Sequence, residues 1–110
     1  MDQSAALAAF AALAQSTRLD VFRLLVRAGT NGMPAGEIGV KLGVRQNTMS
    51  ANLAVLARSG LLRAERDGRT VRYFADLDGI RDLLGFLMQD CCGGRPARCQ
   101  PLIDEIVSTC

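Results

Sequence analysis

The sequence predicts a single, mainly helical domain that carries one β-hairpin, and three observations lead to this prediction. Apolar residues recur every three or four positions over most of the chain, which is the period of amphipathic helices. Strand-like runs replace this period only at residues 61–74, where they flank Asp67 and Gly68, a pair typical of a tight hairpin turn. The chain has 110 residues, enough for one domain and too few for two.

Helices are expected before the hairpin at residues 4–14, 18–28, 34–42 and 46–58. Either Ser16 or Thr17 can cap the second helix. Pro34 suits the first position of the third helix, and Gly43 ends that helix. The Ala-rich first helix has an apolar stripe made of Leu7, Phe10, Leu13 and Ala14.

The two short helices on either side of Gly43 predict a helix-turn-helix. After the hairpin, apolar residues step at helical spacing from Ile80 to Cys91, which predicts a last helix that ends at Gly93 and Gly94. This order of elements is that of a winged helix-turn-helix. Because the first and last helices have no partner left in so small a chain, we expect both to pair with a second copy in a homodimer.

The composition indicates an ordinary globular protein, with 49% hydrophobic and 22% charged residues. No apolar run approaches the roughly 20 residues that a membrane-spanning helix needs, and the amino-terminal segment lacks the positive charge of a signal peptide. We therefore expect no membrane partner and a cytoplasmic location, where thiols stay reduced. The chain has no His and no visible catalytic constellation, so we expect no enzymatic activity.

The helix at 46–58 has a polar face that fits the edges of DNA bases. Its short side chains carry both hydrogen-bond donors and acceptors, and they lie opposite the apolar Met49, Leu53 and Leu56. The hairpin adds cationic side chains that can lie beside phosphates. The predicted partner is double-stranded operator DNA, and a surface that serves only solubility is the alternative. The predicted contacts are Gln46, Asn47, Thr48, Ser50, Ala51, Asn52, Arg66, Arg69 and Arg72.

Two stretches, LAQSTRLDVFRLL and EIGVKLGVRQNTMSANLAVLARSGLLRAERDGRTVRYF, resemble the ArsR/SmtB family of bacterial winged-helix repressors over about residues 5–80. The resemblance implies a homodimer formed through the first and last helices, and repression that an inducer relieves. It also assigns DNA reading to residues 46–48 and 50–52. Arg45 departs from the family pattern because it replaces the usual capping Ser, and Ala51 and Asn52 replace the common Arg-His.

Cys91, Cys92 and Cys99 are the candidate inducer site. The residues at 34–36, where the resemblance would place an arsenic-binding Cys-Val-Cys, contain no thiol, and the zinc sites of the family need His. Three thiolates without a nitrogen ligand suit a soft ion such as arsenite As(III) or antimonite Sb(III). Some members of the resembled family sense arsenite with a similar vicinal Cys pair and a third Cys. No resident cofactor is expected, and Cys110 is either an accessory ligand or irrelevant.

Helix geometry predicts that binding remodels the end of the last helix. Successive helical residues point about 100° apart, so Cys91 and Cys92 cannot both face one ion while the helix is regular. We expect the helix to end there and residues 95–98 to loop back and bring in Cys99. The predicted organisation is a DNA-binding and dimerisation domain at 1–92 and a tail at 93–110 that carries part of the thiol site.

Other uses of the same thiols stay open. The same scaffold could sense a soft divalent metal, with Cys110 as a fourth ligand for zinc or cadmium, or a persulfide or oxidant. A protein of another class, a thiol metalloid carrier that does not bind DNA, would leave the polar face of the helix at 46–58 unexplained.

Overall fold

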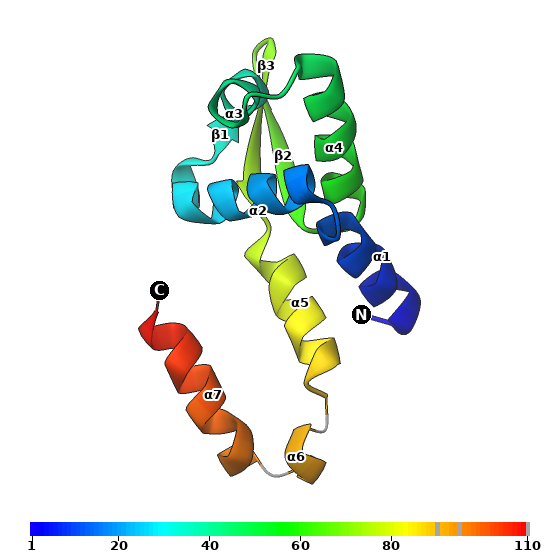
Figure 1. Cartoon of the computed structure of the whole chain (residues 1–110), viewed down its shortest axis with the longest axis vertical. Helices are drawn as coiled ribbons and strands as arrows, with labels where there is room; N and C mark the ends of the chain where they lie inside the picture. The colour runs from blue at the N-terminus through cyan, green and yellow to red at the C-terminus, as the bar shows by residue number, and fades with distance from the viewer. Residues whose placement is uncertain (90, 95, 110) are drawn as a thin grey trace.

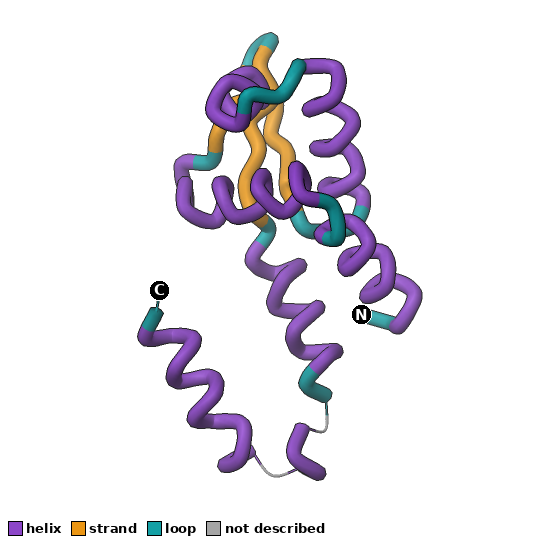
Figure 2. Tube along the Cα trace, viewed as in Figure 1, coloured by secondary structure: helices purple, strands orange, loops and turns teal. Residues whose placement is uncertain are grey.

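The computed structural model describes residues 1–89, 91–94 and 96–109, and it confirms the mainly helical winged helix-turn-helix fold (Figures 1 and 2). Its helices and strands are α1 (Gln3–Leu13), α2 (Ser16–Ala28), the 3₁₀ turn η1 (Gly29–Asn31), β1 (Met33–Pro34), α3 (Ala35–Leu42), α4 (Gln46–Arg58), β2 (Leu62–Asp67), β3 (Thr70–Ala75), α5 (Leu77–Leu87), α6 (Cys91–Gly94) and α7 (Pro96–Ser108).

The sheet has three antiparallel strands in the order β1-β3-β2. The hairpin closes where expected, with Asp67 opposite Thr70. The short strand β1 is a correction, because Met33 pairs with Tyr73 and Pro34 with Arg72 where a turn followed by a helix start was predicted. Pro34 is tolerated there because β1 is an edge strand, which does not need every amide as a donor.

Close packing beside β1 explains why this strand forms. Gly32 has a φ of +58°, and a Cβ at this position would lie 2.5 Å from the Tyr73 carbonyl oxygen. The glycine therefore lets the chain approach β3. Arg72 Nη1 also donates to the Asn31 carbonyl oxygen at 2.8 Å, which ties η1 to the hairpin. These contacts join residues that are far apart in the sequence, so no local pattern predicts them.

Helix α1 turns an alanine face towards the core, which also corrects the expected stripe. Ala6, Ala9 and Ala12 are buried, whereas Leu7 is 59% exposed and Phe10 39% exposed. Small side chains let α1 approach its neighbours α2, α4 and α5 closely. The larger apolar side chains are left on the outer side of the helix in a single copy of the chain.

Helix α2 starts two residues earlier than predicted, with a different cap. Gln15 is the N-cap, and its Oε1 accepts a hydrogen bond from the Arg18 amide at 2.9 Å. Ser16 and Thr17 therefore belong to the first turn and do not cap it. The helix ends at Ala28, as predicted.

The core lies where α2, α3 and α4 cover the sheet. The predicted inward residues of α4, Met49, Leu53 and Leu56, are fully buried, and so is Ile38 of α3. The side chains packed with them include Val21, Leu25, Leu61 and Leu83. This core fixes the helix-turn-helix against the base of the hairpin.

The carboxyl-terminal helices differ most from the prediction. Helix α5 ends at Leu87 and not near Gly93, and Cys91 begins a separate short helix. Residues from Pro96 onward form α7 and not the expected loop, because proline is compatible with the first position of a helix. The chain reverses through α6, so α7 runs in the direction opposite to α5 (Figures 1 and 2).

Both α5 and α7 expose apolar side chains in a single chain. On α5 and the residue that follows it they are Leu77, Leu84, Leu87 and Met88, and on α7 they are Leu102, Ile103, Ile106 and Val107. None of the helices formed by the described residues is both long and apolar enough to cross a membrane.

Candidate nucleic-acid interface and thiol segment

The turn between α3 and α4 is built on glycines. Gly43 is left-handed, with a φ of +66°, and its amide donates to the carbonyl oxygens of Gly39 and Val40. The Val44 amide also donates to the Gly39 carbonyl oxygen at 2.9 Å. A Cβ at Gly39 would lie 3.0 Å from the Val44 carbonyl oxygen, so the missing side chain lets the turn pack closely against the end of α3. This turn sets the angle at which α4 leaves α3.

Two amides stabilise the start of α4, where Arg45 is the N-cap without a side-chain bond to the helix. Asn47 Oδ1 accepts from the Thr48 amide at 2.8 Å, and Gln46 Nε2 donates to the Ala35 carbonyl oxygen at 3.5 Å. The departure of Arg45 from the resembled pattern is therefore offset by Asn47. Gln46 is therefore partly engaged with α3.

The predicted polar face of α4 is present, with one exception. Asn47, Thr48, Ser50 and Ala51 are exposed on the side away from the core. Asn52 is wrongly predicted to lie on this exposed face, because it is buried at 8% exposure and its Oδ1 accepts from Arg18 Nη1 at 3.2 Å. Its position three residues after the buried Met49 is the sequence signal that places it at the edge of the buried side.

The wing carries two kinds of arginine. Arg66 and Arg69 are exposed near the hairpin turn, and neither has a hydrogen-bond or ion-pair partner among the described residues. Arg72 is half-buried and engaged with the Asn31 carbonyl oxygen. The hairpin turn and the start of α4 lie at the same end of the molecule (Figure 1).

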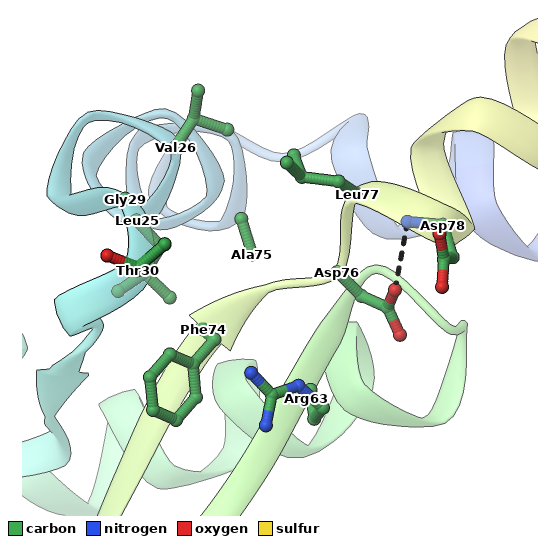
Figure 3. Close-up of a pocket in the computed structure, with 10 residues that line it drawn as sticks. All are labelled: Leu25, Val26, Gly29, Thr30, Arg63, Phe74, Ala75, Asp76, Leu77 and Asp78. Carbon is green, nitrogen blue, oxygen red and sulfur yellow. Dashed lines mark hydrogen bonds between the residues drawn. The ribbon is translucent and has the colours of Figure 1, made fainter.

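A cavity of about 310 Å³ lies at the base of the hairpin, where β2 and β3 meet α2 and the start of α5 (Figure 3). Its charged side chains already have partners. Arg63 stacks 4.3 Å from the centre of the Phe74 ring and pairs with Glu65. Asp76 and Asp78 are held in the network that starts α5. We see no nucleophile with an adjacent base among the described residues that line this cavity.

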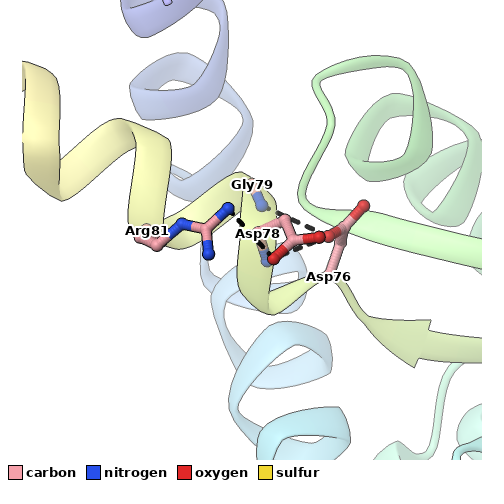
Figure 4. A network of polar contacts seen from close by, with 4 residues as sticks. All are labelled: Asp76, Asp78, Gly79 and Arg81. Atoms are coloured by element: carbon pink, nitrogen blue, oxygen red, sulfur yellow. Dashed lines mark hydrogen bonds and ion pairs between the residues drawn. The ribbon is translucent and has the colours of Figure 1, made fainter.

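The start of α5 is held by carboxylates (Figure 4). Asp76 is the N-cap, and its Oδ1 accepts from the amides of Asp78 and Gly79 at 3.1 and 3.2 Å. The Asp78 carboxylate pairs with Arg81 at 3.2 Å. This capping makes a firm joint between the wing and the helix that leads to the cysteines.

The thiol segment is described in part. Cys99 lies in the first turns of α7, is 4% exposed and is disulfide-bonded. The side chains of Cys91 and Cys92, and all of Cys110, fall outside the described residues. Among the side chains that are described, no group of three acidic, His or Cys residues is placed to hold a metal ion. The predicted three-thiol site therefore stays a prediction.

Sequence comparison agrees with this geometry. A family model described as a helix-turn-helix domain matches residues 13–65. The chain is also 32% identical over 90 residues to an uncharacterised HTH-type transcriptional regulator, YbzH, of Bacillus subtilis. This match covers 71% of the chain and 90% of the relative.

Solved structures share the fold. An ArsR-like transcriptional regulator from Rhodococcus sp. RHA1 has a TM-score of 0.70 at 24% identity, over 94% of this chain and 92% of that one. A homodimeric winged helix-turn-helix domain from Mycobacterium bovis, a possible ArsR-family regulator, has a TM-score of 0.65 at 24% identity, over 97% and 85% of the two chains. The chain has an ArsR-like winged helix-turn-helix fold, with an exposed α4 face and a basic wing. It is a DNA-binding protein and not an enzyme, and it belongs to the HTH-type transcriptional regulators.

Proposed function

We propose that the protein is a homodimeric repressor that releases its operator when trivalent arsenic or antimony binds Cys91, Cys92 and Cys99. The placement of Cys99 is the observation that supports this most directly. Cys99 is buried near the start of α7, which packs against the short helix that begins with Cys91 and Cys92. Its sulfur is disulfide-bonded, so the fold allows another sulfur to reach it.

The chemistry of the ion suits this donor set. Arsenite is As(OH)₃ at neutral pH, and three thiols replace its three hydroxyl groups, which forms three As–S bonds and releases three waters. The product is a pyramid with a lone pair in the fourth direction, so no fourth ligand is needed. Soft thiolates favour such an ion over harder metals. The thiols must be reduced for this reaction, which the cytoplasm provides.

The proposed dimer uses the apolar surfaces that a single chain leaves exposed. Leu7 and Phe10 on α1 and Leu84 and Leu87 on α5 would be buried between two copies. The M. bovis domain with the same fold is homodimeric, which supports a homodimer here. A two-fold dimer presents two recognition helices about 34 Å apart, one turn of DNA, so the operator should be nearly palindromic.

Each half of the dimer would read DNA through α4 and grip it through the wing. Thr48, Ser50 and Ala51 reach base edges, with Asn47 and Gln46 at the start of the helix. Arg66 and Arg69 contact phosphates. Because α6 and α7 continue from α5, an ion bound there would change the interface and couple to DNA binding by about 1–3 kcal/mol.

A second candidate signal is an oxidant, and the disulfide at Cys99 favours it. Two thiols would lose two electrons and two protons to the oxidant and form one S–S bond in place of the ion site. A persulfide or a soft divalent metal could act on the same sulfurs. A metalloid carrier that does not bind DNA is disfavoured by the exposed α4 face.

Release of DNA by different agents tests the proposal. The probe is the duplex that the wild-type protein enriches from a randomised pool, and the reduced complex is titrated with arsenite, antimonite, zinc, cadmium, hydrogen peroxide and a persulfide donor. We expect arsenite or antimonite to free DNA at the lowest dose. Release by peroxide at a lower dose would assign the oxidant signal, and no response to arsenite would reject the proposal.

A further inference from the structure

We propose that Arg18 is a positioning residue for DNA binding, which fastens the recognition helix α4 to the carboxyl end of α1. Its guanidinium bridges three acceptors. Nε donates to the Ala12 carbonyl oxygen at 2.6 Å, and Nη2 donates to the Ala11 carbonyl oxygen at 3.4 Å. Nη1 donates to Asn52 Oδ1 at 3.2 Å. This inference needs only the DNA-binding role of the protein and is independent of the inducer.

The location of Arg18 is unfavourable for its own helix. Arg18 is in the first turn of α2, where the positive end of the helix dipole opposes a cation. The acceptors explain why it is there. Ala11 and Ala12 lie in the last turn of α1, where the helix dipole favours a cation, and the Ala11 carbonyl oxygen accepts from Arg18 in addition to the Ala14 amide. A planar guanidinium can serve these carbonyls and a side chain at once.

Asn52 connects this joint to DNA reading. It is the only buried polar side chain among the described residues, and Arg18 donates to its oxygen. Successive residues of a helix point about 100° apart. Holding Asn52 inward therefore fixes the directions in which its neighbours Ser50 and Ala51 point outward.

The hydrogen bond from Arg18 to Asn52 constrains the direction in which α4 faces, which the apolar contacts of α4 do not. Met49, Leu53 and Leu56 press α4 against the core, but burial of apolar surface has no preferred direction. A hydrogen bond weakens steeply when its angle changes. The Arg18 bond to Asn52 is thus suited to setting the rotation of α4 about its axis, and with it the register of the reading face.

Arg18 could instead contact a DNA phosphate, and the experiment separates the two roles. The variants are Arg18→Met, Asn52→Ala and the double variant, with Arg23→Met as a matched control. Arg23 is exposed on the same helix and has no described partner. The Kd for the enriched duplex is measured over a range of salt concentrations on protein whose fold is verified by circular dichroism.

The two single variants should each raise the Kd by about fivefold or more, and the double variant should raise it no further than the worse single one. The slope of log Kd against log salt should not change, and Arg23→Met should stay within about twofold. Arg18→Lys gives a second test that preserves the charge. One ammonium cannot serve three acceptors, so this variant should also raise the Kd.

Three results would overturn the inference. The first is a double variant whose loss is the product of the two single losses. The second is a salt slope that falls by about 0.9 in Arg18→Met, which assigns Arg18 to a phosphate. The third is an unchanged Kd in Arg18→Lys. A failure of arsenite to release DNA would leave these measurements standing, so the inference and the inducer proposal fail separately.

Discussion

Gly79 is a residue where a single methyl group should decide stability. It lies at the start of α5 against the backbone of Gly60, and an added Cβ would collide with the Gly60 carbonyl oxygen. Because a backbone cannot move aside cheaply, we expect Gly79→Ala to lower the free energy of unfolding by about 1–3 kcal/mol. Urea unfolding measures this change.

Gly36→Ala is the matched control for this prediction. Gly36 is also helical and exposed, and a Cβ there meets nothing within 4 Å. The control should be neutral or stabilise the protein by up to about 1 kcal/mol. Equal destabilisation by the two substitutions would show that the close approach at Gly60 is wrong.

Asp76 makes a second residue-scale prediction. Its carboxylate caps α5 through the amides of Asp78 and Gly79. Asp76→Ala leaves these donors without their side-chain partner and should destabilise the protein by about 1 kcal/mol. Asp82→Ala removes an exposed carboxylate from the same helix and should change stability by less than about 0.5 kcal/mol. Thermal unfolding of both variants compares them, and similar losses would contradict the capping role.

For single residues, helical periodicity predicts correctly which apolar side chains are buried, and it fails for a polar side chain at the edge of the buried side. The inward positions Met49, Leu53 and Leu56 follow from helical spacing and are buried. Asn52 lies three residues after Met49, at the edge of the buried side, but the partner of its polar side chain is Arg18, which lies 34 positions away. No pattern within α4 contains that partner.

At the scale of elements, the wing should supply electrostatic affinity without sequence choice. We expect Arg66→Ala combined with Arg69→Ala to weaken binding to specific and unrelated duplexes alike, and to reduce the slope of log Kd against log salt by about 1.8. Arg27→Ala, in the last turn of α2, is the control and should leave the slope unchanged. Filter binding at several salt concentrations measures the slopes, and a loss confined to one sequence would argue against phosphate contact.

The elements differ in how far local sequence determines them. Helix α4 and the hairpin have the predicted positions, because the apolar spacing of Met49, Leu53 and Leu56 and the turn at Asp67 and Gly68 are local signals. Strand β1 exists only through its pairing with β3, which lies about 40 residues further on. The break between α5 and α6 has no glycine or proline signal at Met88, and the apolar spacing continues past it.

The whole molecule should be a dimer whose interface tolerates no charge. Leu84 is 50% exposed in one copy of the chain, so Leu84→Glu should fold. It would place an unpaired carboxylate in the proposed interface, which should weaken the dimer by about 3 kcal/mol or more. Val40→Glu, at an 81% exposed position of α3, should remain dimeric. Sedimentation equilibrium checks both, and a dimeric Leu84→Glu would place the interface elsewhere.

For the whole molecule, the inducer site is predicted by the chemistry of the cysteines, and the burial of Cys99 in the fold supports it. Cys91 and Cys92 lie on the short helix α6 and Cys99 lies on α7, which packs against α6, and the side chains of the first two are outside the described residues. The predicted loop at 95–98 is helical from Pro96 onward. Because Cys91 and Cys92 begin the short helix α6, an ion bound by both of them would have to unwind α6.

Arsenite titration of the reduced protein–DNA complex tests whether Cys91, Cys92 and Cys99 hold the inducer. Wild type, Cys110→Ser and the triple variant with Ser at all three positions are compared side by side. We predict that wild type and Cys110→Ser release the duplex at similar arsenite concentrations, and that the triple variant binds DNA normally but needs at least about tenfold more arsenite. Release of the triple variant at the wild-type arsenite concentration would show that these three cysteines do not bind the inducer.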